Sequence, residues 1–189
     1  MKNFLLIAIA VLGTTVASAQ KDSTYSLDGT FGGGYVYNIT SFPYGVDGLS
    51  RNGFNGFARV LWNPETILSV GLEIGYTNLY SVDPPEDRAI VHSALVAYPF
   101  YLVLSMEPVD RFSIAIGYGM AMLSSVVDDG TSQTGVTSAS TSVYGALQYL
   151  APIDDRLKIG GEARFTSIDR YRDMNLSFNV LITYSLIRY

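Results

Sequence analysis

Apolar and polar residues alternate with a period of two along most of the chain after residue 24, a pattern typical of β-strands with one apolar face. In the first segment Leu27, Phe31 and Tyr35 share one face, while Asp28 and Thr30 share the other. An α-helix would mix these two sets on every turn. Alternation of the same kind covers residues 54–62, 68–77, 112–122, 142–149, 157–166 and 175–186.

One further segment, residues 89–106, is apolar on both faces and contains Pro99, so its inward and outward positions cannot be assigned from the pattern. A proline inside a strand indicates a bulge or bend. With this segment the sequence predicts eight strands.

The connections between the strands alternate in length. Residues 63–66, 107–110 and 151–155 form short turns that contain proline, whereas residues 41–52, 81–88, 124–138 and 169–174 form the other connections, most of them longer and polar. Outer-membrane barrels combine short periplasmic turns with longer outer loops in this way.

The first 19 residues predict a signal peptide. Lys2 supplies a positive start, an apolar run follows, and Ala17-Ser18-Ala19 fits a cleavage site. The run is too short for a membrane-spanning helix. We therefore expect two units: a signal peptide at 1–19 and a β-barrel at 20–189.

Composition narrows the class of protein. Without Lys2 the mature part has 11 basic and 17 acidic residues, a formal net charge of −6, which argues against nucleic acid as a partner. The chain has no Cys, so disulfides, a lipid anchor on Cys and thiolate metal sites are excluded. Hydrophobic residues make up 48% of the chain, yet no run after residue 19 is long enough for a spanning helix.

The bulk of the side chains indicates which face meets lipid. The apolar faces carry Leu, Ile, Phe and Tyr, whereas the opposite faces carry Ser, Thr, Asn, Gly and Ala with scattered charges. The narrow lumen of an eight-stranded barrel can hold the second set but would be overfilled by the first. The predicted fold is therefore all-β, an eight-stranded antiparallel up-and-down transmembrane β-barrel whose apolar faces point outward.

Aromatic residues gather near the predicted strand ends, as expected for two girdles at the membrane interfaces. The girdle at the turn end comprises Tyr25, Trp62, Phe112, Tyr149 and Tyr184, and the girdle at the loop end comprises Tyr35, Tyr37, Tyr76, Tyr80, Phe165 and Phe178.

Six charges of zero sum lie in the middle of strands on the polar faces: Asp28, Arg59, Glu73, Lys158, Glu162 and Arg164. A hairpin around Pro64 and Glu65 sets Arg59 opposite Gly71, with Glu73 diagonally adjacent. Charges in a narrow lumen must pair or form hydrogen bonds, so we expect an ion-paired plug. The alternative is a gate that opens to a small conductance.

The eight alternating segments, the signal peptide and the final Tyr189 together resemble the small outer-membrane barrels of the OmpA-transmembrane-domain and OmpX type. Residues 68–76 and 112–119 are similar to strands of that group. The resemblance implies a monomer in a bacterial outer membrane, in contact with its lipids and lipopolysaccharide, inserted by the barrel-assembly machinery. The last strand departs from the family pattern, because the face of Tyr189 also carries Ser185 and Thr183.

No cofactor, metal site or catalytic group is expected. His92 is the only histidine, and its neighbour Ser93 points to the opposite face of a strand, so the two cannot form a dyad directly. The sequence favours a non-enzymatic envelope or surface-contact protein. The alternatives are a minor gated pore, a lipid A-modifying barrel enzyme and a soluble lipocalin-like carrier, and the sequence identifies no surface partner.

Overall fold

The computed structural model describes residues 25–39, 49–64, 67–82, 92–128, 133–169 and 173–188. The predicted signal peptide at 1–19 lies outside these ranges. Among the described residues, no helix is long and apolar enough to cross a membrane.

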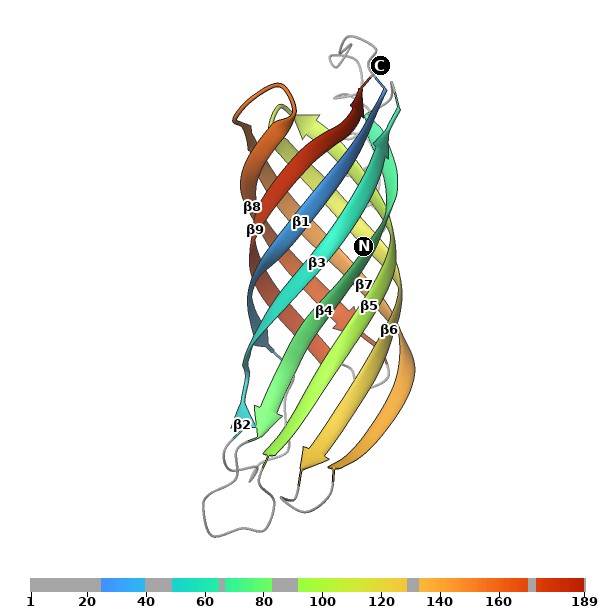
Figure 1. Cartoon of the computed structure of the whole chain (residues 1–189), viewed down its shortest axis with the longest axis vertical. Helices are drawn as coiled ribbons and strands as arrows, with labels where there is room; N and C mark the ends of the chain where they lie inside the picture. The colour runs from blue at the N-terminus through green and yellow to red at the C-terminus, as the bar shows by residue number, and fades with distance from the viewer. Residues whose placement is uncertain are drawn as a thin grey trace, which may run out of the picture.

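Eight long strands form one closed antiparallel barrel, which confirms the predicted fold (Figure 1). The order around the sheet is β2-β4-β3-β1-β9-β8-β7-β6-β5, and pairing of β5 with β4 closes it. The two-residue strand β2 pairs with β4 just beyond the end of β3. The bounds are β1 Ser26–Asn38, β2 Leu49–Ser50, β3 Asn52–Asn63, β4 Leu68–Val82, β5 His92–Val109, β6 Phe112–Asp128, β7 Gln133–Pro152, β8 Leu157–Ile168 and β9 Asp173–Arg188.

The apolar rows face outward and the polar rows face the lumen, as the bulk of the side chains predicts. Leu72, Ile116 and Val180 are 51%, 55% and 65% exposed. On β9, by contrast, Ser177 and Thr183 are buried. A barrel folded for water would have the opposite arrangement, because burial of apolar surface drives folding there.

The structure shows which residues of the segment 89–106 face inward and which face outward. On β5 Tyr101 and Val103 are buried, whereas Phe100 and Leu102 are exposed. Pro99 stays in unbroken register with β6, opposite Ala121. The expected irregularity lies instead on β4, where the register to β5 shifts between Asn78 and Tyr80.

A second register shift explains the departure of the last strand from the family pattern. Leu27 pairs with Ile187, but Asp28 pairs with Ser185, so Leu186 is an extra residue on β9. A β-bulge of this kind changes the phase of the strand. Ile187 is therefore exposed with the outer face, whereas Ser185 is buried in the lumen.

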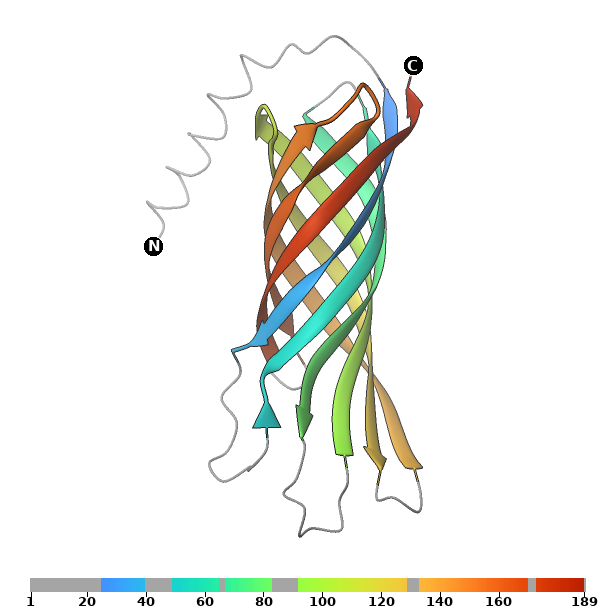
Figure 2. The same ribbon diagram turned by 60° about the vertical axis from the view of Figure 1, so that its left-hand side comes forward.

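The strands at the loop end are longer than predicted, so the prediction of a loop over residues 124–138 was largely wrong. The ladder between β6 and β7 continues to Asp128 and Gln133, whereas the ladder between β7 and β8 ends at Ser142 and Ile168. As a result, β5, β6 and β7 project beyond the rest of the barrel (Figure 2). The extension was not predicted because residues 124–138 are rich in Ser and Thr and lack a bulky apolar face.

Candidate functional site: a charged cluster in the lumen

Four of the six predicted lumenal charges meet in the middle of the barrel. Arg59 lies on β3, Glu73 on β4, and Glu162 and Arg164 on β8. Each occupies an inward position in its strand and each is almost completely buried. Arg59 pairs directly with Glu73 across the hairpin, not with Gly71 as the sequence suggested. The predicted register was wrong by two residues, which preserves the face of each side chain but changes its partner.

Glu73 binds both arginines. Its Oε2 accepts a hydrogen bond from Arg59 Nε at 2.7 Å and forms an ion pair with Arg59 Nη2 at 2.6 Å. Arg164 donates from Nη1 to Glu73 Oε1 at 2.7 Å and from Nη2 to Oε2 at 3.0 Å. The Tyr144 hydroxyl donates to the same carboxylate at 3.1 Å. This two-pronged contact with Arg164 is the strong, directional form of an arginine–carboxylate pair.

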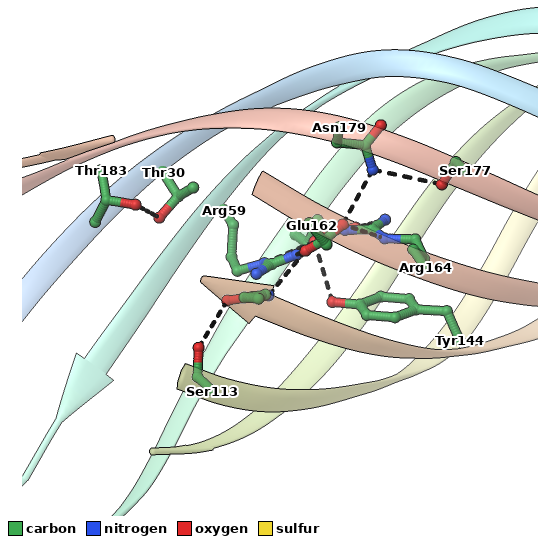
Figure 3. A network of polar contacts seen from close by, with 11 residues as sticks. Thr30, Arg59, Ser113, Tyr144, Glu162, Arg164, Ser177, Asn179 and Thr183 are labelled. Atoms are coloured by element: carbon green, nitrogen blue, oxygen red, sulfur yellow. Dashed lines mark hydrogen bonds and ion pairs between the residues drawn. The ribbon is translucent and has the colours of Figure 1, made fainter. Parts of the chain in front are cut away.

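Glu162 binds the same two arginines from the opposite wall (Figure 3). Its Oε1 accepts from Arg164 Nε at 2.7 Å, and its Oε2 accepts from Arg59 Nη2 at 2.9 Å. Gln148 and Asn179 donate to the two oxygens at 2.8 and 3.1 Å. Two carboxylates and two guanidiniums therefore form a neutral cluster, whose ion pairs and hydrogen bonds offset part of the cost of taking these charges out of water.

Aromatic rings complete the shell around Arg164. Its guanidinium carbon lies over the faces of two rings, 4.2 Å from the centroid of Phe57 and 4.1 Å from that of Tyr144. Such cation–π contacts stabilise a desolvated arginine. Glycines make room for the rings, because a Cβ at Gly32 or Gly117 would lie 2.3 Å from Phe57 or 2.1 Å from Tyr144.

The other two predicted charges lie outside this cluster. Asp28, near the turn end of β1, accepts a hydrogen bond from Asn63 Nδ2 at 2.8 Å. Lys158 is half-buried on β8, four residues before Glu162, and pairs across the ladder with Thr183.

A second, apolar layer crosses the lumen closer to the loop end, and the sequence did not predict it. Its six buried residues are Leu79, Leu95, Ala97, Ala121, Leu123 and Ile168, and Tyr80 packs against them. Between this layer and the charged cluster lies a cavity of about 20 Å³, lined by Asn55, Tyr101 and Arg164 among others. The layer was missed because it draws on the unassigned segment 89–106 and on Leu79, Leu123 and Ile168, which lie between the assigned alternating segments and the predicted loops.

Ten of the eleven predicted girdle aromatics remain candidates for the outer surface, whereas Tyr80 belongs to the inner apolar layer. At the turn end Phe112 and Tyr149 are in ring contact, with centroids 5.0 Å apart. At the loop end Phe54, Tyr76 and Tyr98 form a row across three strands, with centroid distances of 5.3 and 5.6 Å.

Among the described residues, no group of three or more His, Asp or Glu side chains could hold a metal ion. The side chains of His92 and Ser93 lie outside the described part of the structure, although their backbones belong to β5.

Solved structures of small outer-membrane barrels are similar to this chain. The attachment invasion locus protein Ail of Yersinia pestis matches with a TM-score of 0.58 and 10% identity, over 89% of this chain and all of Ail. Neisserial surface protein A matches with a TM-score of 0.50 and 11% identity, over 86% of this chain and 97% of that protein. No family model and no curated protein sequence matches. The similarity establishes the fold, a small closed β-barrel.

Proposed function

We propose that this protein is a non-enzymatic barrel of a bacterial outer membrane, with a closed lumen and a role in the envelope or in surface contact. The observation that carries the proposal is the inversion of the two faces: large apolar side chains cover the outside, while a neutral, hydrogen-bonded charged cluster fills the inside. A soluble carrier would need the opposite arrangement.

The aromatic residues on the outside of β3 span most of the height of a membrane's apolar band. Phe54, in the aromatic row at the loop end, and Trp62, in the turn-end girdle, are outward residues eight positions apart. At ~3.3 Å per residue and a strand tilt of ~40°, this separation corresponds to ~20 Å along the barrel axis. An apolar band of ~25 Å is usual for outer-membrane barrels.

Two layers oppose passage of ions through the lumen. The charged cluster joins β3, β4 and β8, and the apolar layer lies between it and the loop end. A pore would require both layers to move, because a dry apolar constriction blocks ions even when the charged cluster is open. For this reason we favour the closed barrel over the gated pore.

The projecting strands support a role at the cell surface. Short turns of such barrels face the periplasm, so the longer end faces outward. There Thr137 and Thr141 of β7 are exposed, together with Val136. We expect a monomer in contact with lipopolysaccharide and assembled by the barrel-assembly machinery, and the surface partner is not specified by this geometry.

Membrane fractionation combined with gel electrophoresis tests the proposal. We expect the protein in the outer-membrane fraction, with a migration that changes when the sample is heated before electrophoresis. Recovery in the soluble periplasmic extract would refute it. In planar bilayers we expect no conductance from the wild type, and open channels would instead support the pore.

The enzymatic alternative has its own test. Cells that overproduce the protein should contain unaltered lipid A, and the same result is expected for His92→Ala. A modification of lipid A that disappears in His92→Ala would overturn the non-enzymatic role.

A further inference from the structure

The outer face of β8 has a gap in its row of large side chains. Gly161 and Ala163 are the outward residues at two successive rungs, between Ile159 and Phe165, which are exposed large residues. Neither small residue can cover the wall behind it. The result is an open apolar hollow on the outer wall, with Gly161 and Ala163 in its floor.

The neighbouring strands form its sides. Tyr149 and Leu147 of β7 pair with Gly161 and Ala163, and on the other side Val180 and Phe178 of β9 pair with the same two residues. All four side chains are exposed. The hollow has a volume of about 660 Å³ and reaches Pro108 and Phe112 toward the turn end.

We propose that this hollow binds one acyl chain of a phospholipid from the leaflet at the turn end of the barrel. The proposal rests on the membrane location given above, since hydrocarbon is then the medium that surrounds the wall. An acyl chain gains contacts with both ridges at once, and dispersion contacts of this kind add up over many atoms.

A cationic group at the rim fits the phosphate of such a lipid. Arg111 precedes Phe112, and its carbonyl accepts a hydrogen bond from Leu150 N at 2.9 Å, which places it beside the strand of Tyr149. Its side chain is half exposed, and its ion pair with Asp110 is long, at 3.6 Å. The guanidinium is thus available to an anionic head group at the level of the turn-end girdle.

A second copy of the barrel is a poorer occupant. The hollow spans two rungs (~7 Å) along β8 and three strand spacings (~14 Å) from β9 to β6. This footprint is roughly an eighth of the ~800 Å² that each partner contributes to a stable protein interface.

Gly161→Leu is the decisive variant, with Gly145→Leu as its control. A Cβ at Gly161 would lie 3.6 Å from the Asn179 carbonyl oxygen, an ordinary contact, so the leucine fills the hollow without straining the backbone. Gly145 faces outward on β7 outside the hollow, and a Cβ there meets no atom within 4 Å. Both variants add the same side chain to the same surface.

The measurement is native mass spectrometry after insertion into phosphatidylethanolamine–phosphatidylglycerol vesicles and extraction into mild detergent. We expect wild type and Gly145→Leu to retain one phospholipid, and Gly161→Leu to lower the retained fraction roughly tenfold. Arg111→Gln should lower it by a smaller factor. Equal retention by all variants, no retention by any, or a dimer that Gly161→Leu abolishes would each overturn the inference.

Heat-modifiable migration of the same samples separates the lipid site from the membrane location on which it rests. Barrels that fail to insert would refute the membrane location. Inserted barrels that give any of the contrary lipid results would refute only the lipid site.

Discussion

A double-mutant cycle between Glu73 and Arg164 should show that the two residues are coupled in the free energy of unfolding. Glu73→Gln removes one of two carboxylates and leaves Arg59 and Arg164 with a single acid, Glu162, in a site sealed from water. Loss of one partner from a buried ion pair costs ~3–5 kcal/mol, because the other charge stays buried without compensation. We expect a loss of this size in the free energy of unfolding.

Arg164→Met should cost about as much, since it leaves two carboxylates to share Arg59. The double variant Glu73→Gln/Arg164→Met restores neutrality, because the remaining Arg59–Glu162 pair keeps its contact at 2.9 Å. Its cost should therefore fall short of the sum of the single costs by ~2 kcal/mol or more.

The assay is urea unfolding in lipid vesicles, followed by the fluorescence of Trp62, the only tryptophan, and by gel migration. Asp155→Asn, in the exposed turn between β7 and β8, is the control and should leave the unfolding midpoint unchanged. Costs that simply add in the double variant would refute the view that the four charges act as one neutral unit.

Three further predictions concern the lumen wall, a turn and the lipid face. Gly117→Ala should destabilise the barrel by ~1–3 kcal/mol, since its methyl group would displace the Tyr144 ring, whereas Gly145→Ala should be neutral in the same urea assay. The backbone N–H groups of Arg156 and Leu157 donate to the carboxylate of Asp154 and lower its pKa below the usual range, so its stabilising effect is complete at neutral pH and disappears as the pH falls through the lowered pKa. Asp154→Ala should therefore be less stable than wild type at pH 7, and a difference that persists unchanged in strong acid would contradict this origin. Leu102→Arg, on the lipid face, should cost ~2–4 kcal/mol in vesicles, and a change near zero would place this residue away from the middle of the membrane.

The faces of the strands were predictable from the sequence because alternation records them directly. Val180 and Thr183 lie on opposite faces of one strand, and their bulk and polarity suffice to assign each face. An error of two residues, such as the one that set Arg59 opposite Gly71, leaves this assignment intact. The class of fold was therefore accessible even though the exact pairing was not.

Contacts across the lumen could not be predicted in the same way. Arg59 binds Glu162, which is 103 positions away on a strand that is not its neighbour in the sheet. Alternation shows only that both side chains point inward. Which inward residues reach the same height depends on the stagger of the strands around the barrel, and the bulges at Leu186 and beyond Asn78 alter that stagger locally.

The charged cluster connects opposite walls of the barrel, which the backbone hydrogen bonds between neighbouring strands do not. Ladders join each strand to its neighbours around the circumference, whereas Glu73 of β4 binds Arg164 of β8 across the interior. A narrow barrel could flatten without breaking any ladder, because strand pairing constrains neighbours and not opposite walls. Ion pairs across the lumen, together with the contacts of Arg164 with the rings of Phe57 and Tyr144, oppose such flattening. We therefore expect the neutral cluster to hold the cross-section of the barrel, and the proposed closure of the lumen would follow from the same contacts.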